Sequence, residues 1–515
     1  MKFADFILAH DGDDLAQLAL ARSRFAAEVD LAGFGGADGA GTGTSGFDLA
    51  LTTLEVRRKL RDKVPEWYAL PSLVYPLRVS GEQCSSTVTA RYKAAVAAGA
   101  PSETASAPAP CTDGGVLVHG SPDLVLPCTD EVPPVHGNLR LADLTGGLGV
   151  DTWAFAQVFG EVLYNEMRPE LAAAAEHNFR ELGLTNVRVR NCTLVPGSSV
   201  IPGSDRVSSL IPGSDPGSPE ASVSQILDGF RPDVLFLDPA RRASDGRKVF
   251  RLEDCQPDVL QLLPELLAAC PHVLLKLSPM ADITLVCKQL GRVKEVHVVA
   301  ADGECKELLL LLERDYDGPY STTIFEDGAI MEIPGQARDE GNGAATQIPG
   351  QARNDEGGAR DEGNGAATQI PGQAGNDEGG ARDEVSFVMA DFDRPSFLFE
   401  PGKAMMKAGA FEVPGQYGLE KLGKHTHLYV GAEVPAELKP FGKTFRILEV
   451  VPLNNRSVKA IGPKYPKADV TARNIPLTSD QLRAKLGVRS GGDVHIFGLH
   501  SDALHSNLLL VVQRA

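Results

Sequence analysis

The chain contains no run of about 18 apolar residues, the length that a membrane-spanning helix requires, so we expect no membrane span. Its eight cysteines are scattered and include no C-x-x-C pair, which argues against a zinc site and against a disulfide framework. The first residues lack the basic start and apolar core of a secretion signal. These absences predict a cytoplasmic protein with reduced thiols and no metal centre. They leave the oligomeric state open.

Positive charge is also scarce, because the formal net charge is −18. Such a deficit argues against a nucleic-acid partner only if it is spread over the whole molecule. The stretch from Glu326 to Ser386 contains 13 acidic residues and 4 arginines, a net of −9. From Phe387 to the C-terminus there are 17 basic and 12 acidic residues, a net of +5. The acidity is therefore concentrated in one segment, and the C-terminal module is basic.

The stretch that organises the chain is Leu139 to Asp151, where a short apolar run ends in Asp143 and a glycine-rich turn leads into a helix. Strand, glycine turn and helix form the opening unit of a nucleotide-binding α/β domain. The glycines allow the backbone to come close to a ligand. Four residues of the turn are candidate ligand contacts: Thr145, Gly146, Gly147 and Gly149. A turn that binds no ligand is the alternative explanation.

Acidic residues around this turn distinguish two classes of cofactor. A nicotinamide site places a pyrophosphate on the helix N-terminus, and Asp143 and Asp151 are poor neighbours for that group. The two acids suit a cationic ligand with a free amino group, such as S-adenosyl-L-methionine (SAM). A second apolar run ends in Glu166, and an acid at this place can accept hydrogen bonds from both ribose hydroxyls. We therefore expect SAM to be the cofactor.

The segments that follow predict a mainly parallel α/β sheet. Further strand candidates lie at 187–191, 233–238, 273–277, 293–299 and 307–312. Helical candidates between the earlier strands are 169–182 and 257–269. The last two strand candidates are joined by a hairpin-like turn. Five β/α units followed by a hairpin predict the Rossmann-like, seven-stranded sheet of the class I methyltransferases.

Five segments resemble bacterial class I SAM-dependent methyltransferases that carry a C-terminal THUMP-like domain. The matching segments are Glu82–Lys93, Asp143–Thr152, Asp238–Arg242, Phe399–Phe411 and Thr471–Pro476. The resemblance implies that a ferredoxin-like segment and then an α+β THUMP-like module follow the methyltransferase domain. It also implies methyl transfer from SAM, and it does not name the acceptor.

Domain boundaries follow from shifts in composition. We expect an N-terminal helical region over 1–97, a linker over 98–137, a methyltransferase domain over 138–325, an acidic repeat insertion over 326–386, a ferredoxin-like segment over 387–440 and a THUMP-like domain over 441–515. A low-complexity insertion is expected inside the methyltransferase domain, at 196–222.

Both insertions contain near-identical repeats. In the second, the run Asp339–Arg360 recurs as Asp361–Arg382 with one change. Neither insertion has an apolar stripe that could bury a core. We hypothesise that both are passive insertions in surface loops, where added length costs little. A functional acidic tether is the alternative, and loss of folding or activity on deletion of residues 333–384 would contradict the passive insertion.

Polar residues before a predicted helix of the N-terminal region are candidate ligand contacts. Gln83, Ser85 and Ser86 offer hydrogen bonds that could reach a nucleoside or its carboxylate. An ordinary helix cap is the alternative. The aromatic residues at Pro65–Tyr68 and at Tyr75 predict the core of a small helical domain rather than substrate contacts.

The C-terminal module shows alternating apolar runs and a capped helix over Thr478–Leu486, which predict an α+β structure. Five of its basic residues form a candidate docking patch: Lys459, Lys464, Lys467, Arg473 and Arg483. Scattered surface charges are the alternative explanation.

The candidate catalytic residues lie after the predicted fourth strand and at the end of the fifth: Asp238, Pro239, Arg241 and Lys276. Methyl transfer from a sulfonium is an in-line displacement that depends on alignment. Asp238 would accept a hydrogen bond from an acceptor amine, and Pro239 would fix the loop. Arg241 would bind phosphate or stack on a base. Lys276 would either face the site or pair structurally with Asp238.

Two departures from known motifs narrow this chemistry. Many base N-methyltransferases carry an aromatic residue after the Asp-Pro pair, and Ala240 stands here instead, which puts an exocyclic amine target in doubt. The run Asp-Pro-x-Arg also resembles uracil C5 methyltransferases, but their nucleophilic cysteine has no counterpart near Ser278. At the end of the third strand, Asn191 is expected to accept a hydrogen bond from the adenine amino group.

The prediction is therefore a SAM-dependent methyltransferase that acts on RNA, either tRNA or rRNA. The alternatives are an inactive RNA-binding protein on the same fold and a methyltransferase for a protein or a small molecule. The acids Asp143, Glu166 and Asp238 argue against an inactive protein. The C-terminal module argues against a small metabolite, because such a substrate needs no separate docking domain.

Overall fold

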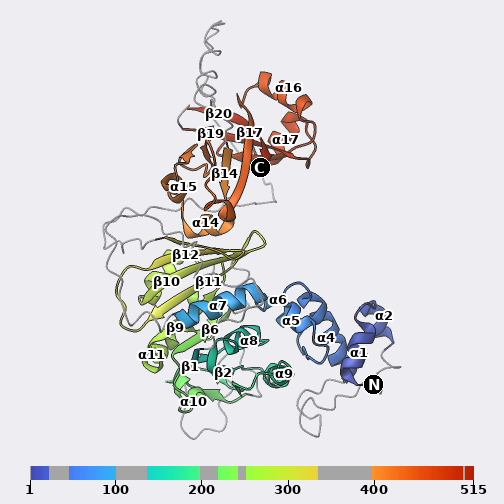
Figure 1. The fold of residues 1–515 in the computed structure, drawn as a ribbon, viewed down its shortest axis with the longest axis vertical. Coiled ribbons are helices and arrows are strands. Elements are labelled where there is room, and N and C mark those ends of the chain that lie inside the picture. Colours follow the sequence, from blue (N-terminus) through green and yellow to red (C-terminus); the bar gives the residue numbers. More distant parts are fainter. Residues whose placement is uncertain are drawn as a thin grey trace, which may run out of the picture. The chain divides into compact units, whose positions relative to one another are not determined.

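The computed structural model describes residues 2–21, 46–99, 136–197, 218–241, 251–333, 397–502 and 505–515. The chain divides into two compact units (Figure 1). The first consists of Met1–Gln336, Pro401–Gln416 and Ala436–Gly442, and the second of Ala337–Glu400, Tyr417–Pro435 and Lys443–Ala515. Most of the expected linker and of both expected insertions lies outside the described residues, so their proposed boundaries stay predictions.

The first unit is built on a nine-stranded sheet with the order β13-β12-β10-β11-β9-β6-β1-β2-β3. Five neighbouring strands run parallel: β1 (His136–Asp143), β2 (Phe159–Asn165), β3 (Val187–Arg190), β6 (Val234–Leu237) and β9 (His272–Leu277). The hairpin strand β11 (Glu304–Glu313) lies antiparallel between β9 and β10 (Val293–Ala301). These strands reproduce the predicted class I arrangement.

Two strands extend this sheet beyond the predicted seven. They are β12 (Ser321–Glu326), parallel to β10, and β13 (Ala329–Ile333), antiparallel to β12. Residues 326–333, which the sequence assigned to the acidic insertion, therefore belong to the sheet. A local signal for this hairpin exists, because Asp327 and Gly328 both have positive φ, at 48° and 93°. An Asp-Gly pair favours such a tight turn. The negative charge of these residues placed them in the predicted acidic insertion, and the hairpin was therefore missed.

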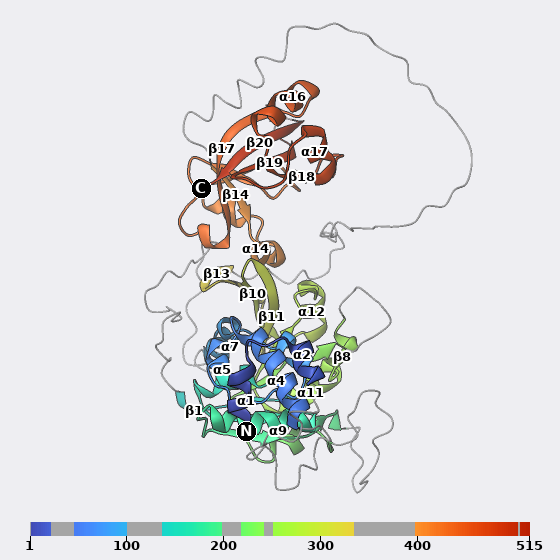
Figure 2. The same cartoon turned by 90° about the vertical axis from the view of Figure 1, so that its right-hand side faces the viewer.

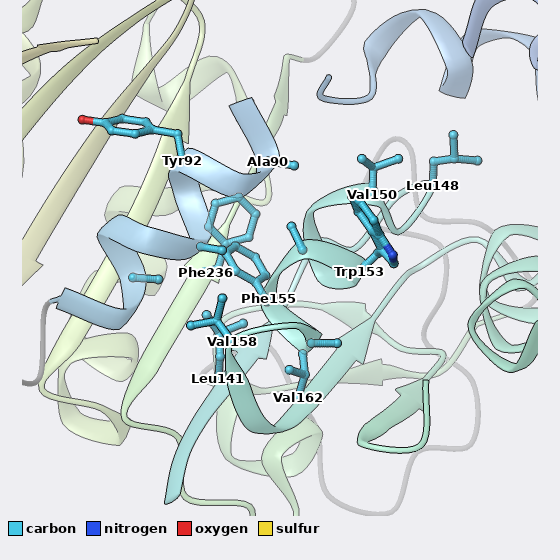
Figure 3. Close-up of a cluster of buried hydrophobic side chains, with 14 of the residues drawn as sticks. Ala90, Tyr92, Leu141, Leu148, Val150, Trp153, Phe155, Val158, Val162 and Phe236 are labelled. Atoms are coloured by element: carbon cyan, nitrogen blue, oxygen red, sulfur yellow. The ribbon is translucent and has the colours of Figure 1, made fainter. Parts of the chain in front are cut away.

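The main core lies where helices pack on the face of the sheet that carries Leu141 and Phe236 (Figure 3). Helix α8 (Val150–Ala156) begins directly after the glycine turn and packs against α7 (Thr87–Gly99). Its Phe155 lies 5.0 Å from the ring of Phe236, measured between centroids. Other helices of this unit are α9 (Pro169–Glu181), α10 (Val223–Leu227), α11 (Val259–Ala269), α12 (Ile283–Leu290) and α14 (Lys403–Ala408).

The N-terminal region is helical, as predicted, and Figure 2 shows its blue helices in front of the green sheet domain. Its elements are α1 (Phe3–His10), α2 (Leu15–Leu20), α4 (Gly46–Leu60), α5 (Pro65–Tyr68) and α6 (Arg78–Gln83), followed by α7. Trp67 and Tyr75 are fully buried and stack at 6.3 Å between ring centroids. The amide of Asn178 on α9 bonds both the N–H and the carbonyl of Val74. These aromatics thus form core, and α9 is tied to the helical region.

The second unit holds a seven-stranded sheet with the order β15-β16-β14-β17-β20-β19-β18. The strands are β14 (Phe397–Pro401), β15 (Glu420–Lys421), β16 (Tyr429–Gly431), β17 (Gly442–Pro452), β18 (Asp469–Arg473), β19 (Val494–Ser501) and β20 (Ser506–Arg514). Helices α16 (Asn455–Lys464) and α17 (Ser479–Leu486) complete it. The predicted cap of α17 is present, since Thr478 and Gln481 form a reciprocal capping box.

In the described part of the chain, none of the helices has the length and apolar character to cross a membrane. Among the same residues, no group of three or more His, Cys, Asp or Glu side chains is arranged to hold a metal ion.

Candidate functional site

A cleft of about 910 Å³ opens at the carboxyl ends of β1, β2, β6 and β9. Ligands of open α/β sheets bind at this edge. Most of the residues predicted from the sequence line it: Gln83, Ser85, Asp143, Thr145, Gly146, Gly147, Gly149, Asp151, Glu166, Asp238, Pro239 and Lys276. Segments that are far apart in the sequence therefore contribute to one site.

The glycine turn needs glycine for two different physical reasons. Gly147 and Gly149 have φ of +56° and +93°, a region that L side chains rarely adopt. At Gly149 a Cβ atom would also lie 2.8 Å from the Phe179 ring. The backbone carbonyl of Gly147 accepts a hydrogen bond from Tyr164 Oη at 2.6 Å. The turn is thus held in one shape, with its backbone facing the cleft.

Glu166 follows β2 and fixes the turn from the other side. Its Oε2 accepts a hydrogen bond from the Gly147 N–H at 2.9 Å, and its Oε1 accepts one from the Arg168 N–H at 2.9 Å. Burial raises the pKa of the Glu166 carboxyl. Each carboxylate oxygen has a second lone pair for a ligand hydroxyl, so the side chain can hold the turn and a ribose together.

Asp143 lies deeper, with 1% of its surface exposed. Its Oδ1 accepts from the Thr145 N–H at 3.1 Å, and its Oδ2 accepts from Thr152 Oγ1 at 2.6 Å. Burial raises the pKa of Asp143 to about 7. Both of these bonds shape the turn and the start of α8. Asp143 therefore has a structural role in addition to its place in the lining of the cleft.

Thr145 connects the glycine turn to the predicted catalytic loop, because its Oγ1 accepts a hydrogen bond from the Asp238 N–H at 2.6 Å. The Asp238 side chain is 37% exposed and its Oδ2 lies 2.5 Å from Lys276 Nζ. Both alternatives for Lys276 are thus realised, since it lines the cleft and pairs with Asp238. Burial alone would lower the pKa of Lys276, but Asp238, Glu307 and Asp151 together raise it, so the ammonium stays charged.

Two charged residues of this region were not selected from the sequence. Glu307 of β11 lines the cleft, and Lys93 of α7 binds its Oε1 at 2.5 Å. Lys93 Nζ also lies 3.3 Å from Asp151 Oδ1, while Ser85 Oγ donates to Asp151 Oδ2 at 2.9 Å. The family resemblance of the segment Glu82–Lys93 indicated a role at the cleft. No local sequence pattern, however, shows that Lys93 contacts Asp151 and Glu307.

Three predicted contacts are not among the residues that line the cleft. The side chain of Asn191 contacts the backbone instead, and its Nδ2 donates a hydrogen bond to the Glu166 carbonyl at 2.7 Å. Ser86 caps α7, because Thr89 N donates to its Oγ at 3.3 Å. This is the ordinary cap that was the alternative. Arg241 ends β7 (Ala240–Arg241), which pairs with β8 (Cys255–Gln256); its side chain and Arg242 lie outside the described residues.

Thr193, two residues after Asn191, does line the cleft. It belongs to the short strand β4 (Thr193–Leu194) and is 5% exposed. Its Oγ1 is buried and has no hydrogen-bond partner in the described structure. Strand β3 ends at Arg190, where the sequence suggested a strand that continued to residue 191.

The charge of the cleft matches a cationic ligand. Six acidic residues line it against three basic ones. The acids are Asp143, Asp151, Glu166, Glu170, Asp238 and Glu307, and the bases are Arg168, Lys276 and Lys306. The carboxylate of Glu166 could accept hydrogen bonds from ribose hydroxyls, the unpartnered hydroxyl of Thr193 is open to a ligand, and the surplus of carboxylates suits the cationic SAM. The residues present therefore fit this cofactor.

Comparisons with known proteins agree with the fold. A family profile described as a ferredoxin-like domain matches residues 397–438, and one described as THUMP domain-like matches residues 442–514. No curated protein matches the chain in sequence. A crystal structure of a candidate methyltransferase from Porphyromonas gingivalis W83 is similar over 100% of this chain and 97% of that one, with a TM-score of 0.61 and 22% identity.

Other solved structures match about a third of the chain. The T. thermophilus 16S rRNA N2 G1207 methyltransferase, solved with AdoMet and guanosine, has a TM-score of 0.22 and 13% identity over 34% of this chain and 38% of its own. A ribosomal protein L11 methylase from Lactobacillus delbrueckii subsp. bulgaricus has a TM-score of 0.21 and 14% identity, over 35% of this chain and 70% of its own. The sheet topology, the similarity to the P. gingivalis structure and the two family profiles show a class I methyltransferase fold joined to a ferredoxin-like segment and a THUMP-like domain, as the sequence resemblance predicted.

Proposed function

We propose that this protein transfers a methyl group from SAM to a base in tRNA or rRNA. The observation that carries the proposal is the cleft at the carboxyl edge of the sheet, with its glycine turn, its ribose acid and its surplus of carboxylates. The P. gingivalis protein, similar over nearly its full length and described as a candidate methyltransferase, supports the same class of enzyme.

The cofactor would occupy the part of the cleft between the glycine turn and β4. Glu166 would accept hydrogen bonds from the ribose hydroxyls, and Thr193 would contact the adenine. Asp151, at the start of α8, would face the amino group. Bound SAM supplies an electrophilic methyl group on a sulfonium centre, so the protein needs no further activation of the donor.

The acceptor would enter beside Asp238. This carboxylate would accept a hydrogen bond from an N–H of the acceptor and so orient its lone pair toward the methyl group. Lys276 stays charged and therefore acts by holding Asp238 rather than by removing a proton. Ala240 lines the cleft where many base methyltransferases have an aromatic ring, so this residue does not stack on the base.

RNA is favoured as the acceptor by the basic character of the chain after residue 386. The candidate patch is only partly available, because Lys464, Arg473 and Arg483 form ion pairs with Glu449, Glu400 and Asp480. Lys459 on α16 and Lys467 after it are exposed. Arg489 is also exposed, and its backbone forms an isolated parallel β-bridge with that of Lys467. These three residues redefine the patch, which we call the α16 patch.

The proposal is tested by comparing modified nucleosides from strains with and without the gene. Total RNA, separated into tRNA and rRNA, is digested and analysed by mass spectrometry. We expect one methylated nucleoside to disappear without the gene and to return with the wild-type protein but not with Asp238→Ala. If all nucleosides are unchanged while purified protein transfers labelled methyl groups from SAM to a protein fraction, the acceptor is not RNA.

A further inference from the structure

A buried lysine ties the N-terminal helices to the reactive end of the cleft. Lys93 lies on α7 and its side chain is 0% exposed. Its Nζ is 2.5 Å from Glu307 Oε1 and 3.3 Å from Asp151 Oδ1. Both carboxylates line the cleft, whereas Lys93 has no exposed surface there. Lys93 therefore acts on the cleft only through these two acids.

The second lysine of this region, Lys276, shares the same acids at longer range. Its Nζ lies 3.8 Å from Glu307 Oε2 and 4.0 Å from Asp151 Oδ2, but 2.5 Å from Asp238 Oδ2. The two lysines thus divide the carboxylates between them. Lys93 makes the short contact with Glu307, which leaves the short contact of Lys276 to Asp238.

The charges of this cluster leave one negative charge uncompensated, because three carboxylates face two ammonium groups. Asp238 is the most exposed of the three acids, at 37% against 12% for Asp151 and 5% for Glu307. Attraction between such groups is strong where water is excluded. Asp151 is the acid without a short ion pair, at 3.3 Å from Lys93 Nζ and 4.0 Å from Lys276 Nζ, so the surplus negative charge falls on it.

We propose that Lys93 is a positioning residue for methyl transfer. It neutralises Glu307 and Asp151 so that Lys276 stays bonded to Asp238 and holds that carboxylate in place for the acceptor. Without Lys93, the two buried acids attract Lys276, because a buried carboxylate without a partner is costly. Lys276 then leaves Asp238, whose side chain is exposed enough to rotate. The inference rests on the proposed function, in which Asp238 orients the acceptor.

The experiment compares Lys93→Met with the double variant Lys93→Met/Glu307→Gln. The double variant restores the original net charge of the cluster and removes the acid that would attract Lys276. Arg91→Met is the matched control, because Arg91 lies on the same helix in a partly exposed ion pair with Glu66. Crystal structures of all three give the distance between Lys276 Nζ and Asp238, and steady-state assays give kcat and the KM for SAM.

In Lys93→Met we expect this distance to exceed hydrogen-bond range and kcat to fall about tenfold or more, with KM for SAM changed by less than about twofold. The double variant should restore both the contact and most of kcat, and Arg91→Met should behave as wild type. An intact contact with normal kcat in Lys93→Met overturns the proposal. An equal loss of kcat in both Lys93 variants also overturns it, since that result indicates a structural anchor.

The crystallographic readout needs no acceptor, so it separates this inference from the proposed function. If the wild-type protein methylates no RNA but Lys276 moves in Lys93→Met and returns in the double variant, the choice of acceptor is wrong and the positioning role stands. If Lys93→Met does not fold, the double variant still tests the proposal. Loss of the contact between Lys276 and Asp238 in the double variant would contradict the claim that Glu307 is the acid that draws Lys276 away.

Discussion

Glu166 combines two tasks in one buried side chain. It holds the glycine turn through the Gly147 N–H and presents the remaining lone pairs of its carboxylate to the cleft. A residue with both tasks would link the shape of the turn to the occupancy of the proposed ribose site. We therefore expect substitutions at this position to affect cofactor binding both by direct contact and through the backbone.

We expect Glu166→Ala to weaken SAM binding by about 10- to 100-fold, since a hydrogen bond to a charged group contributes roughly 1.5–3 kcal/mol. Glu166→Gln keeps the shape and should lose less. Burial raises the pKa of Glu166, so the wild-type carboxylate is protonated as pH falls and SAM binding should weaken in acid. Calorimetric titration at several pH values checks this. An unchanged dissociation constant in Glu166→Ala would refute the ribose contact.

Thr193 and Asn191 lie two positions apart, and substitutions at both are expected to weaken SAM binding for different reasons. Thr193→Val keeps the shape and removes only the hydroxyl, so SAM affinity should fall by about 2- to 10-fold, the range of a neutral hydrogen bond. Asn191→Asp should also weaken binding, because Asp cannot donate to the Glu166 carbonyl that Asn191 Nδ2 now contacts. The same titration measures both variants. Tighter binding by Asn191→Asp would restore the original interpretation of that residue as the adenine contact.

Asp143 predicts a pH dependence of folding stability. Its folded-state pKa of about 7 lies above its ordinary value of 3.8, so the contribution of Asp143 to folding stability is fully present below pH 3.8 and is lost as pH rises toward 7. Asp143→Asn keeps the shape of the side chain but cannot ionise, so the variant should not lose stability through ionisation of this group as pH rises. Relative to wild type, the variant should gain stability between pH 4 and pH 7, by a few kcal/mol. Denaturant melts at both pH values measure this, and parallel curves would contradict the prediction.

At the scale of elements, short apolar runs and the glycine turn made the sheet of the first unit predictable from the sequence. The ends of β1, β2 and β6 carry Asp143, Glu166 and Asp238, and their common edge follows from parallel strand order alone. What the sequence concealed depends on tertiary contacts. The positions of Thr193 after β3 and of the buried Lys93 depend on packing between distant segments, and no local sequence pattern indicates such packing.

The crossing of α16 and α17 depends on one glycine. A Cβ atom at Gly462 would lie 1.9 Å from the Leu486 carbonyl oxygen, so the helices would have to move apart. Gly462→Ala should destabilise the protein by about 1–3 kcal/mol. Gly415→Ala is the control, because no heavy atom lies within 4 Å of its Cβ position. Thermal melts compare the two, and equal midpoints would show that the helices adapt.

At the scale of the molecule, we expect the first unit to bind the cofactor and the second unit to bind RNA. The cleft belongs wholly to the first unit, and the α16 patch to the second. Removal of the chain from Phe387 onward would not separate them cleanly. It would also remove α14, whose Lys407 Nζ donates to the Ala281 carbonyl at 2.6 Å in the first unit. Charge reversal is therefore the better test of docking.

We expect Lys459→Glu/Lys467→Glu to weaken RNA binding and to make it less dependent on salt, because fewer counterions are released. SAM binding should be unchanged. Lys443→Glu, on β17 of the same unit, changes an equally exposed charge outside the patch and should have a smaller effect. Filter binding at several salt concentrations provides the measurement. If the two changes weaken binding equally, RNA is held by overall charge rather than by this patch.

The central claim is that the cleft is built for SAM, and calorimetric titration of the wild-type protein with SAM and with NAD tests it most directly. The account predicts saturable binding of SAM, loss of this binding when Gly147 is replaced by a bulky residue, and no binding of NAD. Tight binding of NAD together with no binding of SAM would contradict it.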